Sequence, residues 1–290
     1  MLHALGIALC LVLLAGCHSP ASQSHSRLKA SLSLYASFDQ GVDADFARGD
    51  KRLYHGRNME QRFAGQPGLP EGTKTRLEPN AGRFGQALHF AEAQAPVVYF
   101  RAPHNVGFRS NQWSGTVSVW LSTDPQTRLN PGYCDPIQIT SKAWDDAAFF
   151  FEFEKRTNSI PFRLGVYADR NVWNPNNRDW GKMAPSEKPL ITVDAPPFSA
   201  GKWTHAVFTF ENFNTGQPDG VARLYLDGEL RGTISSRTQT FHWDPEKSLI
   251  MLGIGYVGLY DELSLFDRAL SADEIKTLRD LPQGVRTLLP

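Results

Sequence analysis

The chain is poor in cysteine and carries no net charge, and each shortage excludes a class of protein. Its 290 residues include three cysteines, and because Cys10 and Cys17 fall in an N-terminal apolar segment, Cys134 has no partner for an intrachain disulfide. The 30 Lys and Arg residues are balanced by 30 Asp and Glu residues, whereas nucleic-acid-binding proteins normally carry a basic excess. We therefore expect a fold stabilised by its core and no nucleic-acid partner.

Motifs of several enzyme classes are also missing. There is no HExxH or CxxC pattern for zinc, no GxSxG nucleophile elbow and no phosphate-binding loop between a strand and a helix. The sequence instead has 18 Phe, 8 Tyr and 7 Trp, enough for a large core, together with 24 Gly and 19 Pro. This composition excludes disorder along the whole chain and favours many short strands joined by turns.

An apolar run at residues 4–14 has the length of the hydrophobic region of a secretory signal peptide and is too short to span a bilayer. It ends in Leu-Ala-Gly-Cys at 14–17, which resembles the lipobox of bacterial lipoproteins, where the peptide is cut before a cysteine that is then lipidated. We predict a signal peptide at 1–16, lipidation of Cys17 and a polar tether at 17–29. Since His18, not Asp, follows the cysteine, resemblance to enterobacterial sorting implies an exported protein on the outer membrane. The alternative is an ordinary signal peptide and a soluble secreted protein.

From residue 28 onward, hydrophobicity alternates with a period of two, which is typical of strands with one buried face. The alternation is clear at 32–39, 117–122, 149–154 and 204–210. Asp-Gly at 227–228, between two such runs, predicts a hairpin with a type I′ turn. One helix is predicted, near the C-terminus, where Ser271 and Glu274 form a capping box.

Four segments, in this order, resemble those of the LamG-like, concanavalin A-like lectin and glucanase jelly rolls. They are GRFGQALHF at 82–90, GKWTHAV at 201–207, LYLDG at 224–228, and YDEL at 260–263 followed by RALSADEI at 268–275. The resemblance implies an all-β, two-sheet antiparallel jelly-roll sandwich with a short C-terminal helix, forming one domain at 30–290. It also implies carbohydrate binding.

The resemblance further implies a metal site. Relatives of this fold often hold a structural calcium ion near the closing and first strands, and the matching carboxylates here are Asp39 and Asp261, with backbone carbonyls of 82–84 as further ligands. The alternation places Asp261 on one face of the last strand with Leu259, Leu263 and Leu265. A carboxylate among leucines is costly unless it is paired or coordinated. Alternatively, Asp261 accepts N–H bonds from a turn or pairs with an arginine.

A loop at 171–180 joins two tryptophans to several asparagines. Tryptophan faces stack on sugar rings, while amide and charged side chains hydrogen-bond hydroxyl groups, so this composition favours a carbohydrate site. Trp144 and Tyr133 lie in neighbouring loops. The predicted ligand-binding residues are Trp144, Trp173, Asn174, Asn176, Asn177, Arg178 and Trp180. The alternative is that the rings only pin the loop to the sandwich.

Glu152 and Glu154 share a strand face and are candidates for the two carboxylates of a hydrolase. The ExDxxE and ExDxE patterns of laminarinase-like enzymes are absent, however, and Arg156 follows on the same face, which favours a solvated, salt-bridged surface. We predict no catalytic residue and a non-catalytic protein that binds a glycan or glycoprotein at the cell envelope, held to the membrane by its N-terminal lipid. The alternatives are a glycoside hydrolase or polysaccharide lyase of the same fold, or a structural or protein-interaction module.

Overall fold

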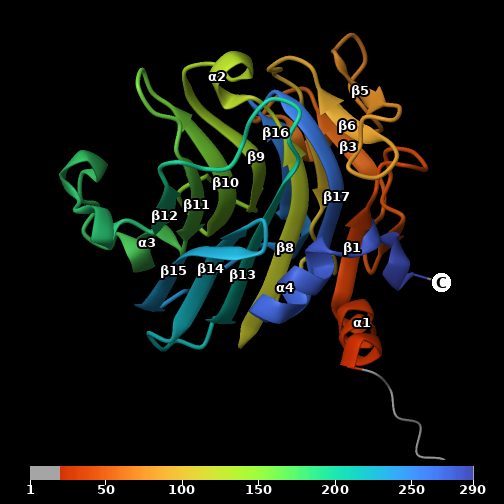
Figure 1. Ribbon diagram of the computed structural model, residues 1–290. Coiled ribbons are helices and arrows are strands. Elements are labelled where there is room, and N and C mark those ends of the chain that lie inside the picture. Colours follow the sequence, from red (N-terminus) through yellow and green to blue (C-terminus); the bar gives the residue numbers. More distant parts are fainter. Residues whose placement is uncertain (1–19, 290) are drawn as a thin grey trace, which may run out of the picture.

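Two antiparallel sheets lie face to face in the computed structural model, which describes residues 20–289 (Figure 1). The nine-stranded sheet has the order β15 (Glu229–Arg237), β14 (Gly220–Leu226), β13 (Thr204–Phe213), β8 (Trp113–Ser122), β17 (Gly258–Phe266), β1 (Leu32–Ala36) and β2 (Phe46–Ala47), and β6 (Ala87–Phe90) pairs with both β17 and β5 (Thr75–Glu78). The eight-stranded sheet has the order β12 (Leu190–Val193), β11 (Phe162–Tyr167), β10 (Ala148–Lys155), β9 (Gly132–Thr140), β16 (Leu249–Ile254), β7 (Val97–Arg101), β3 (Leu53–Gly56) and β4 (Gln66–Pro67).

The remaining elements are short. The helices are α1 (Pro20–Ser31), α2 (Pro125–Arg128), α3 (Arg170–Trp173) and α4 (Ala272–Arg279), the single 3₁₀ turns are η1 (Arg62–Ala64), η2 (Trp180–Lys182), η3 (Pro185–Glu187), η4 (Pro245–Lys247) and η5 (Arg286–Leu288), and β18 (Pro282–Val285) follows α4. Among residues 20–289, no helix has the length and apolar composition needed to cross a bilayer. The predicted all-β, two-sheet sandwich with a short C-terminal helix is confirmed.

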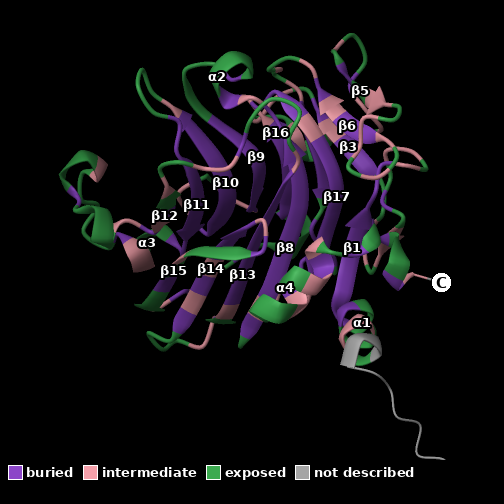
Figure 2. Cartoon of the chain, in the orientation of Figure 1, coloured by how far each residue is buried: buried purple, intermediate pink, exposed green. Residues whose placement is uncertain are grey.

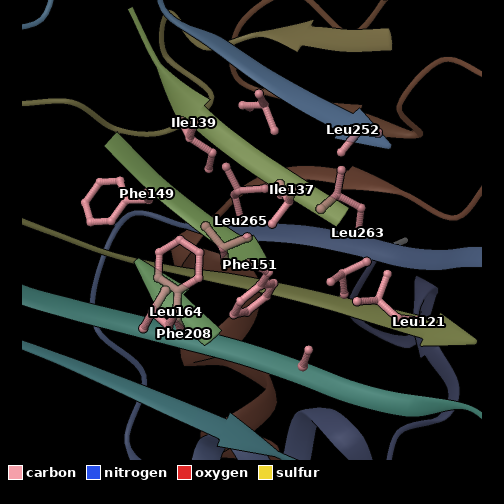
Figure 3. Packing of buried hydrophobic residues seen from close by; sticks show 14 of the residues in the cluster. Leu121, Ile137, Ile139, Phe149, Phe151, Leu164, Phe208, Leu252, Leu263 and Leu265 are labelled. Atoms are coloured by element: carbon pink, nitrogen blue, oxygen red, sulfur yellow. The ribbon is translucent and has the colours of Figure 1, made fainter. Parts of the chain in front are cut away.

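The core fills the space between the two sheets. Figure 3 shows side chains of both sheets pointing toward one another, among them Phe149 and Phe151 from β10 and Phe208 from β13. Phe149 stacks on Phe208 with ring centroids 5.4 Å apart, and Phe151 meets the same ring edge-on at 5.3 Å. Because alternate residues of each strand enter this layer, the strands are largely buried while the loops are exposed (Figure 2).

A second, smaller apolar cluster lies on the outer face of the nine-stranded sheet, beneath α4. Ile275 and Leu278 of α4 pack there against Val207 and Tyr225 of the sheet. The predicted capping box begins this helix, since the Ser271 hydroxyl accepts from the Glu274 N–H at 3.2 Å and the Glu274 carboxylate accepts from the Ser271 N–H at 2.9 Å. The predicted hairpin is also present, with Asp227 and Gly228 both at positive φ, as a type I′ turn requires.

The segment predicted as a polar tether is partly helical. From Pro20 onward it forms α1, and Leu28 of this helix is fully buried in the cluster beneath α4. The polar composition of the segment hid this contact, because one well-placed leucine is enough to dock the helix. The predicted signal peptide, Cys17 and His18 lie outside the described residues.

The prediction that Leu259, Asp261, Leu263 and Leu265 share a face is wrong. The pairing of β17 with β8 shifts between Asp261 and Ser264, and Glu262 takes a φ of 54°, which marks a β-bulge. The bulge changes the phase of the strand, so that Tyr260, Leu263 and Leu265 enter the core. Asp261 pairs with Trp120 instead and lies on the other face of the sheet.

The end strands of the two sheets meet on one side of the sandwich. β12 and β15 contact each other, and the side chain of Ile191 occupies the space beside Gly232, where a Cβ atom would collide with it. Away from this side, the sheets end in β2 and β4, which have two residues each, and in the four-residue β5, the outer strand of the branch through β6.

Candidate functional site

A pocket of about 860 Å³ opens on the outer face of the eight-stranded sheet. Since Phe149 and Phe151 point into the core, the residues between and beyond them, Phe150 and Glu152, point outward into the pocket. The lining residues come from β9, β10, β11 and β16 and from three surrounding loops, and they are Met59, Arg62, Tyr133, Cys134, Asp135, Gln138, Lys142, Ala143, Trp144, Phe150, Glu152, Arg163, Tyr167, Trp180 and Ile254.

Aromatic rings form the walls of this pocket. Trp144 is 52% exposed and Tyr133 is 64% exposed, so both present apolar surface to an incoming ligand. Tyr167 is buried behind them and contacts Trp144 edge-on, with centroids 5.7 Å apart, and Trp180 at 6.1 Å. Such rings suit the apolar face of a planar or cyclic ligand.

The floor is made of an ion-pair network. Arg163 of β11 donates from Nε to Glu152 Oε1 at 2.7 Å and from a terminal nitrogen to Glu154 Oε2 at 2.7 Å, while Arg156 reaches the same oxygen of Glu154 at 2.5 Å. The Tyr133 ring lies over the Arg163 guanidinium, 5.3 Å away. The face is therefore salt-bridged, as predicted, but the prediction that it is solvated is wrong.

Burial and the two arginines shift the pKa values of these two glutamates in opposite directions. Glu152 and Glu154 are each 8% exposed because β9 and β11 flank them and Arg163 extends across them. Burial raises the pKa of Glu152, and the charge of Arg163 only partly opposes this. Burial would also raise the pKa of Glu154, but the hydrogen bond from Arg156 and the charge of Arg163 lower it below its usual range.

Two further polar side chains of the floor, Asp135 and Gln138, come from β9. A bulge in β9 brings Asp135 there, because the pairing with β10 shifts between Phe151 and Phe153. In a regular strand, Asp135 would share the core-facing side of Ile137. Burial raises the pKa of the Asp135 carboxyl well above its usual range, the negative charge of Glu152 adds to this, and Arg163 opposes it.

The cations that line the pocket are already engaged. Arg62 donates to the carbonyl oxygens of Met59 and Lys142, the second at 3.0 Å, and its burial lowers its pKa. The Lys142 ammonium pairs with Asp169 at 2.6 Å. Arg163 is held by the two glutamates described above, so each lining cation of the described chain has its own partner.

The structure brings some of the predicted ligand-binding residues to this pocket and keeps others away. Trp144 and Trp180 line it. Trp173 does not: its ring packs against the core and its indole N–H donates to the Asp145 carbonyl at 2.8 Å, which pins the loop. Asn174 is buried and holds the backbone of Arg178 through two hydrogen bonds, of 2.8 Å and 3.1 Å.

The other three predicted ligand-binding residues, Asn176, Asn177 and Arg178, are exposed and do not line the pocket. Asn177 accepts from Arg170 at 3.0 Å. Arg178 pairs with both carboxylate oxygens of Glu187, at 2.6 Å and 3.1 Å. Asn176 is exposed to solvent. The loop therefore contributes one ring, that of Trp180, to the pocket.

Asp39 and Asp261, the predicted calcium ligands, both lie beside the loop at 82–86, but their carboxyl oxygens face backbone N–H groups. Asp261 accepts from the N–H of Phe84 at 2.8 Å, and Asp39 accepts from the N–H of Gln86 at 2.7 Å and pairs with Arg286 at 2.6 Å. Calcium needs six to eight oxygen ligands, and no group of three or more His, Cys, Asp or Glu residues that could hold a metal occurs in the described part of the chain. The donor set does not fit a calcium ion, and the geometry favours the alternative of N–H bonds from a turn.

Comparison with known proteins agrees with this architecture. The family model described as the concanavalin A-like lectin/glucanases superfamily matches residues 98–276. Domain 4 of AbnA, a GH43 extracellular arabinanase from Geobacillus stearothermophilus solved in complex with arabinotriose, has a TM-score of 0.51 at 14% identity, covering 85% of this chain and 98% of that one.

Botulinum neurotoxin binding domains have the same fold. The type DC domain, solved in complex with SialylT, has a TM-score of 0.54 at 13% identity and covers 90% of this chain. A type C structure, reported with cell entry that depends on two ganglioside molecules, has a TM-score of 0.55 at 12% identity and covers 91%. The chain spans about half of these two toxin chains, 52% and 53%. No curated protein matches the chain.

Proposed function

Because the chain belongs to the concanavalin A-like lectin/glucanase superfamily, we propose that it binds a glycan, free or on a glycoprotein, in the pocket on the eight-stranded sheet and does not turn it over. The observation that carries this proposal is the composition of the pocket, in which the exposed rings of Trp144 and Tyr133 stand beside a floor of buried polar groups. Sugar rings have apolar faces and hydroxyl edges, so they match both surfaces.

The structural relatives support a carbohydrate partner. The arabinanase domain was solved with arabinotriose and the type DC domain with SialylT, and cell entry of the type C toxin depends on interaction with two ganglioside molecules. These ligands differ from one another, so the relatives support the class of partner and leave its identity to experiment.

The ion pairs on the floor support binding without catalysis. A retaining or inverting glycosidase needs one carboxylate that is free to act as nucleophile or base. Glu152 is bonded to Arg163 through Nε at 2.7 Å, and Glu154 is shared between Arg163 and Arg156. A glycoside hydrolase or polysaccharide lyase would have to break this network, and this is why we place the enzyme second.

The test is a glycan array probed with the full chain purified in detergent, followed by calorimetry on any glycan that binds. Replacing Trp144 and Trp180 by Ala removes two stacking surfaces, and we expect affinity to fall by roughly tenfold or more, about 1.4 kcal/mol. Leu230→Ala is the matched control, because Leu230 is 54% exposed on β15 of the other sheet.

The outcomes separate the three candidate functions. Binding without product, weakened in the double tryptophan variant, supports the proposal. Release of shorter oligosaccharides during incubation would favour the enzyme. If no glycan binds, or the double variant binds as well as the original chain, carbohydrate binding in this pocket is refuted, and a structural or protein-interaction role takes its place.

A further inference from the structure

The pocket floor holds two polar side chains that the ion pairs of the floor do not engage. Asp135 is 9% exposed and Gln138 is 3% exposed, and both line the pocket. Neither is among the residues of the described chain whose polar atoms are fully enclosed and unpaired, so the polar atoms of both reach the space of the pocket. Polar groups that face a pocket hydrogen-bond to water, and a ligand with matching groups takes the place of that water.

The charges around these two residues restrict what that ligand is. Arg62, Lys142 and Arg163 line the pocket, but carbonyl or carboxylate oxygens of the chain already hold each of them. An anionic ligand would have to displace one of these partners and would also lie beside the Glu152 carboxylate, which lines the same floor. The pocket therefore suits a ligand without charge.

We propose that Asp135 and Gln138 determine the specificity of this site by binding hydroxyl groups of an uncharged sugar unit, whose apolar face lies on Trp144 and Trp180. This inference rests on the proposed function and adds the class of glycan to it, neutral rather than uronic or sulfated.

The chemistry of the two side chains matches hydroxyl groups. A protonated carboxyl and a primary amide each donate and accept hydrogen bonds, as a sugar hydroxyl does. Burial and the nearby charge of Glu152 hold the pKa of the Asp135 carboxyl well above its usual range, which favours the protonated form that can donate. Arg163 on the same floor is paired with Glu152 and Glu154.

Four variants test the proposal by calorimetry, with neutral gluco- and arabino-oligosaccharides of three units and trigalacturonic acid as probes. Asp135→Leu and Gln138→Leu remove the polar groups, and each is expected to weaken binding of the neutral probe by more than about tenfold. Asp135→Asn keeps a neutral donor and acceptor and is expected to stay within about threefold of the original affinity. Leu230→Ala again serves as the control.

Melting curves show whether each variant is folded, and Asp135→Leu is expected to melt no lower than the original chain, because the substitution breaks no ion pair of the floor. The inference is overturned if both leucine variants bind the neutral probe normally while the double tryptophan variant does not, and the proposed function then stands. Tighter binding of trigalacturonic acid than of every neutral probe also overturns it. Failure of every probe and of the whole array refutes the inference and the proposed function together.

Discussion

Asp261 and Glu262, adjacent residues of β17, hold their carboxyl groups away from water where the strand bulges. Burial raises the pKa of Asp261 to about 8, although N–H bonds from Phe84 lower it in part. Burial likewise raises the pKa of Glu262 to about 7, opposed by hydrogen bonds from the Tyr35 hydroxyl, at 2.5 Å, and the Val285 N–H. Both carboxyls therefore keep a proton at a pH where they would lose it in the unfolded chain.

The stability of the fold is expected to fall as the pH rises from 7 to 9. Between pH 7 and pH 8 the folded chain still holds most of the Asp261 proton and the unfolded chain does not, so the free energy of unfolding decreases by up to about 1.4 kcal/mol per pH unit, and this slope fades above pH 8 as the folded carboxyl also ionises. Asp261→Asn removes the titrating group and should flatten this slope. The measurement is the urea midpoint at intervals of half a pH unit.

A comparison with Asp194→Asn controls this experiment, because Asp194 is an exposed aspartate. Its slope should equal that of the original chain. Equal slopes in the original chain and in Asp261→Asn would contradict the role given to the buried carboxyl. The interval starts at pH 7 to avoid His205, whose burial lowers its pKa to about 3 and whose contribution to stability changes at lower pH.

Single residues of the pocket can be predicted from the sequence when their residue type is itself typical of a binding site, as tryptophan is. Trp180 is predicted because a loop rich in tryptophan and asparagine is unusual, and Trp144 because it lies in a neighbouring loop. Asp135 was missed, because its position relative to Ile137 places it in the core of a regular strand. Pro136 beside it was the available signal, since a proline cannot donate to a sheet ladder and often marks a bulge.

At the scale of elements, the period-two alternation predicted the strands well because it depends on each strand alone. The two bulges, at Asp135 and at Glu262, were not predictable in the same way. A bulge is set by the register with the neighbouring strand, far away in sequence, and it reverses the faces of every residue beyond it. The Arg163 pairing with Glu152 depends on register for the same reason, since these residues come from β11 and β10.

The loop at 82–86, between β5 and β6, is expected to keep its conformation without calcium. Its N–H groups at Phe84 and Gln86 already bind the Asp261 and Asp39 carboxylates. Adding EGTA should leave the melting midpoint unchanged, and so should adding calcium. A midpoint that falls in EGTA and recovers with excess calcium would restore the calcium site predicted from the family resemblance.

For the molecule as a whole, the pocket and the N-terminal end lie on opposite faces. The pocket opens on the outer face of the eight-stranded sheet, whereas Leu28 of α1 packs in the cluster beneath α4 on the outer face of the other sheet. We propose that the chain is exported and anchored through a lipid on Cys17, with the outer membrane as its destination. This arrangement would leave the pocket accessible.

The anchor predicts that a palmitate label enters the protein in bacterial cells and that the protein is found with the outer membrane. Cys17→Ser should abolish the label, because the lipid is attached to the thiol. Cys134→Ser should keep it, since Cys134 is buried in the domain. A label that persists in Cys17→Ser, or that is absent from the original chain, would favour the soluble secreted alternative.

The contact between β12 and β15 affects how neighbouring copies of the protein can associate. An unpaired strand edge offers a ladder of N–H and C=O groups on which a neighbouring molecule can add a strand and begin to aggregate. Here β12 and β15 cover each other, and the remaining end strands are short: β2 and β4 have two residues each and β5 has four. Copies held side by side on a membrane at high density would therefore have only short strand edges through which to pair.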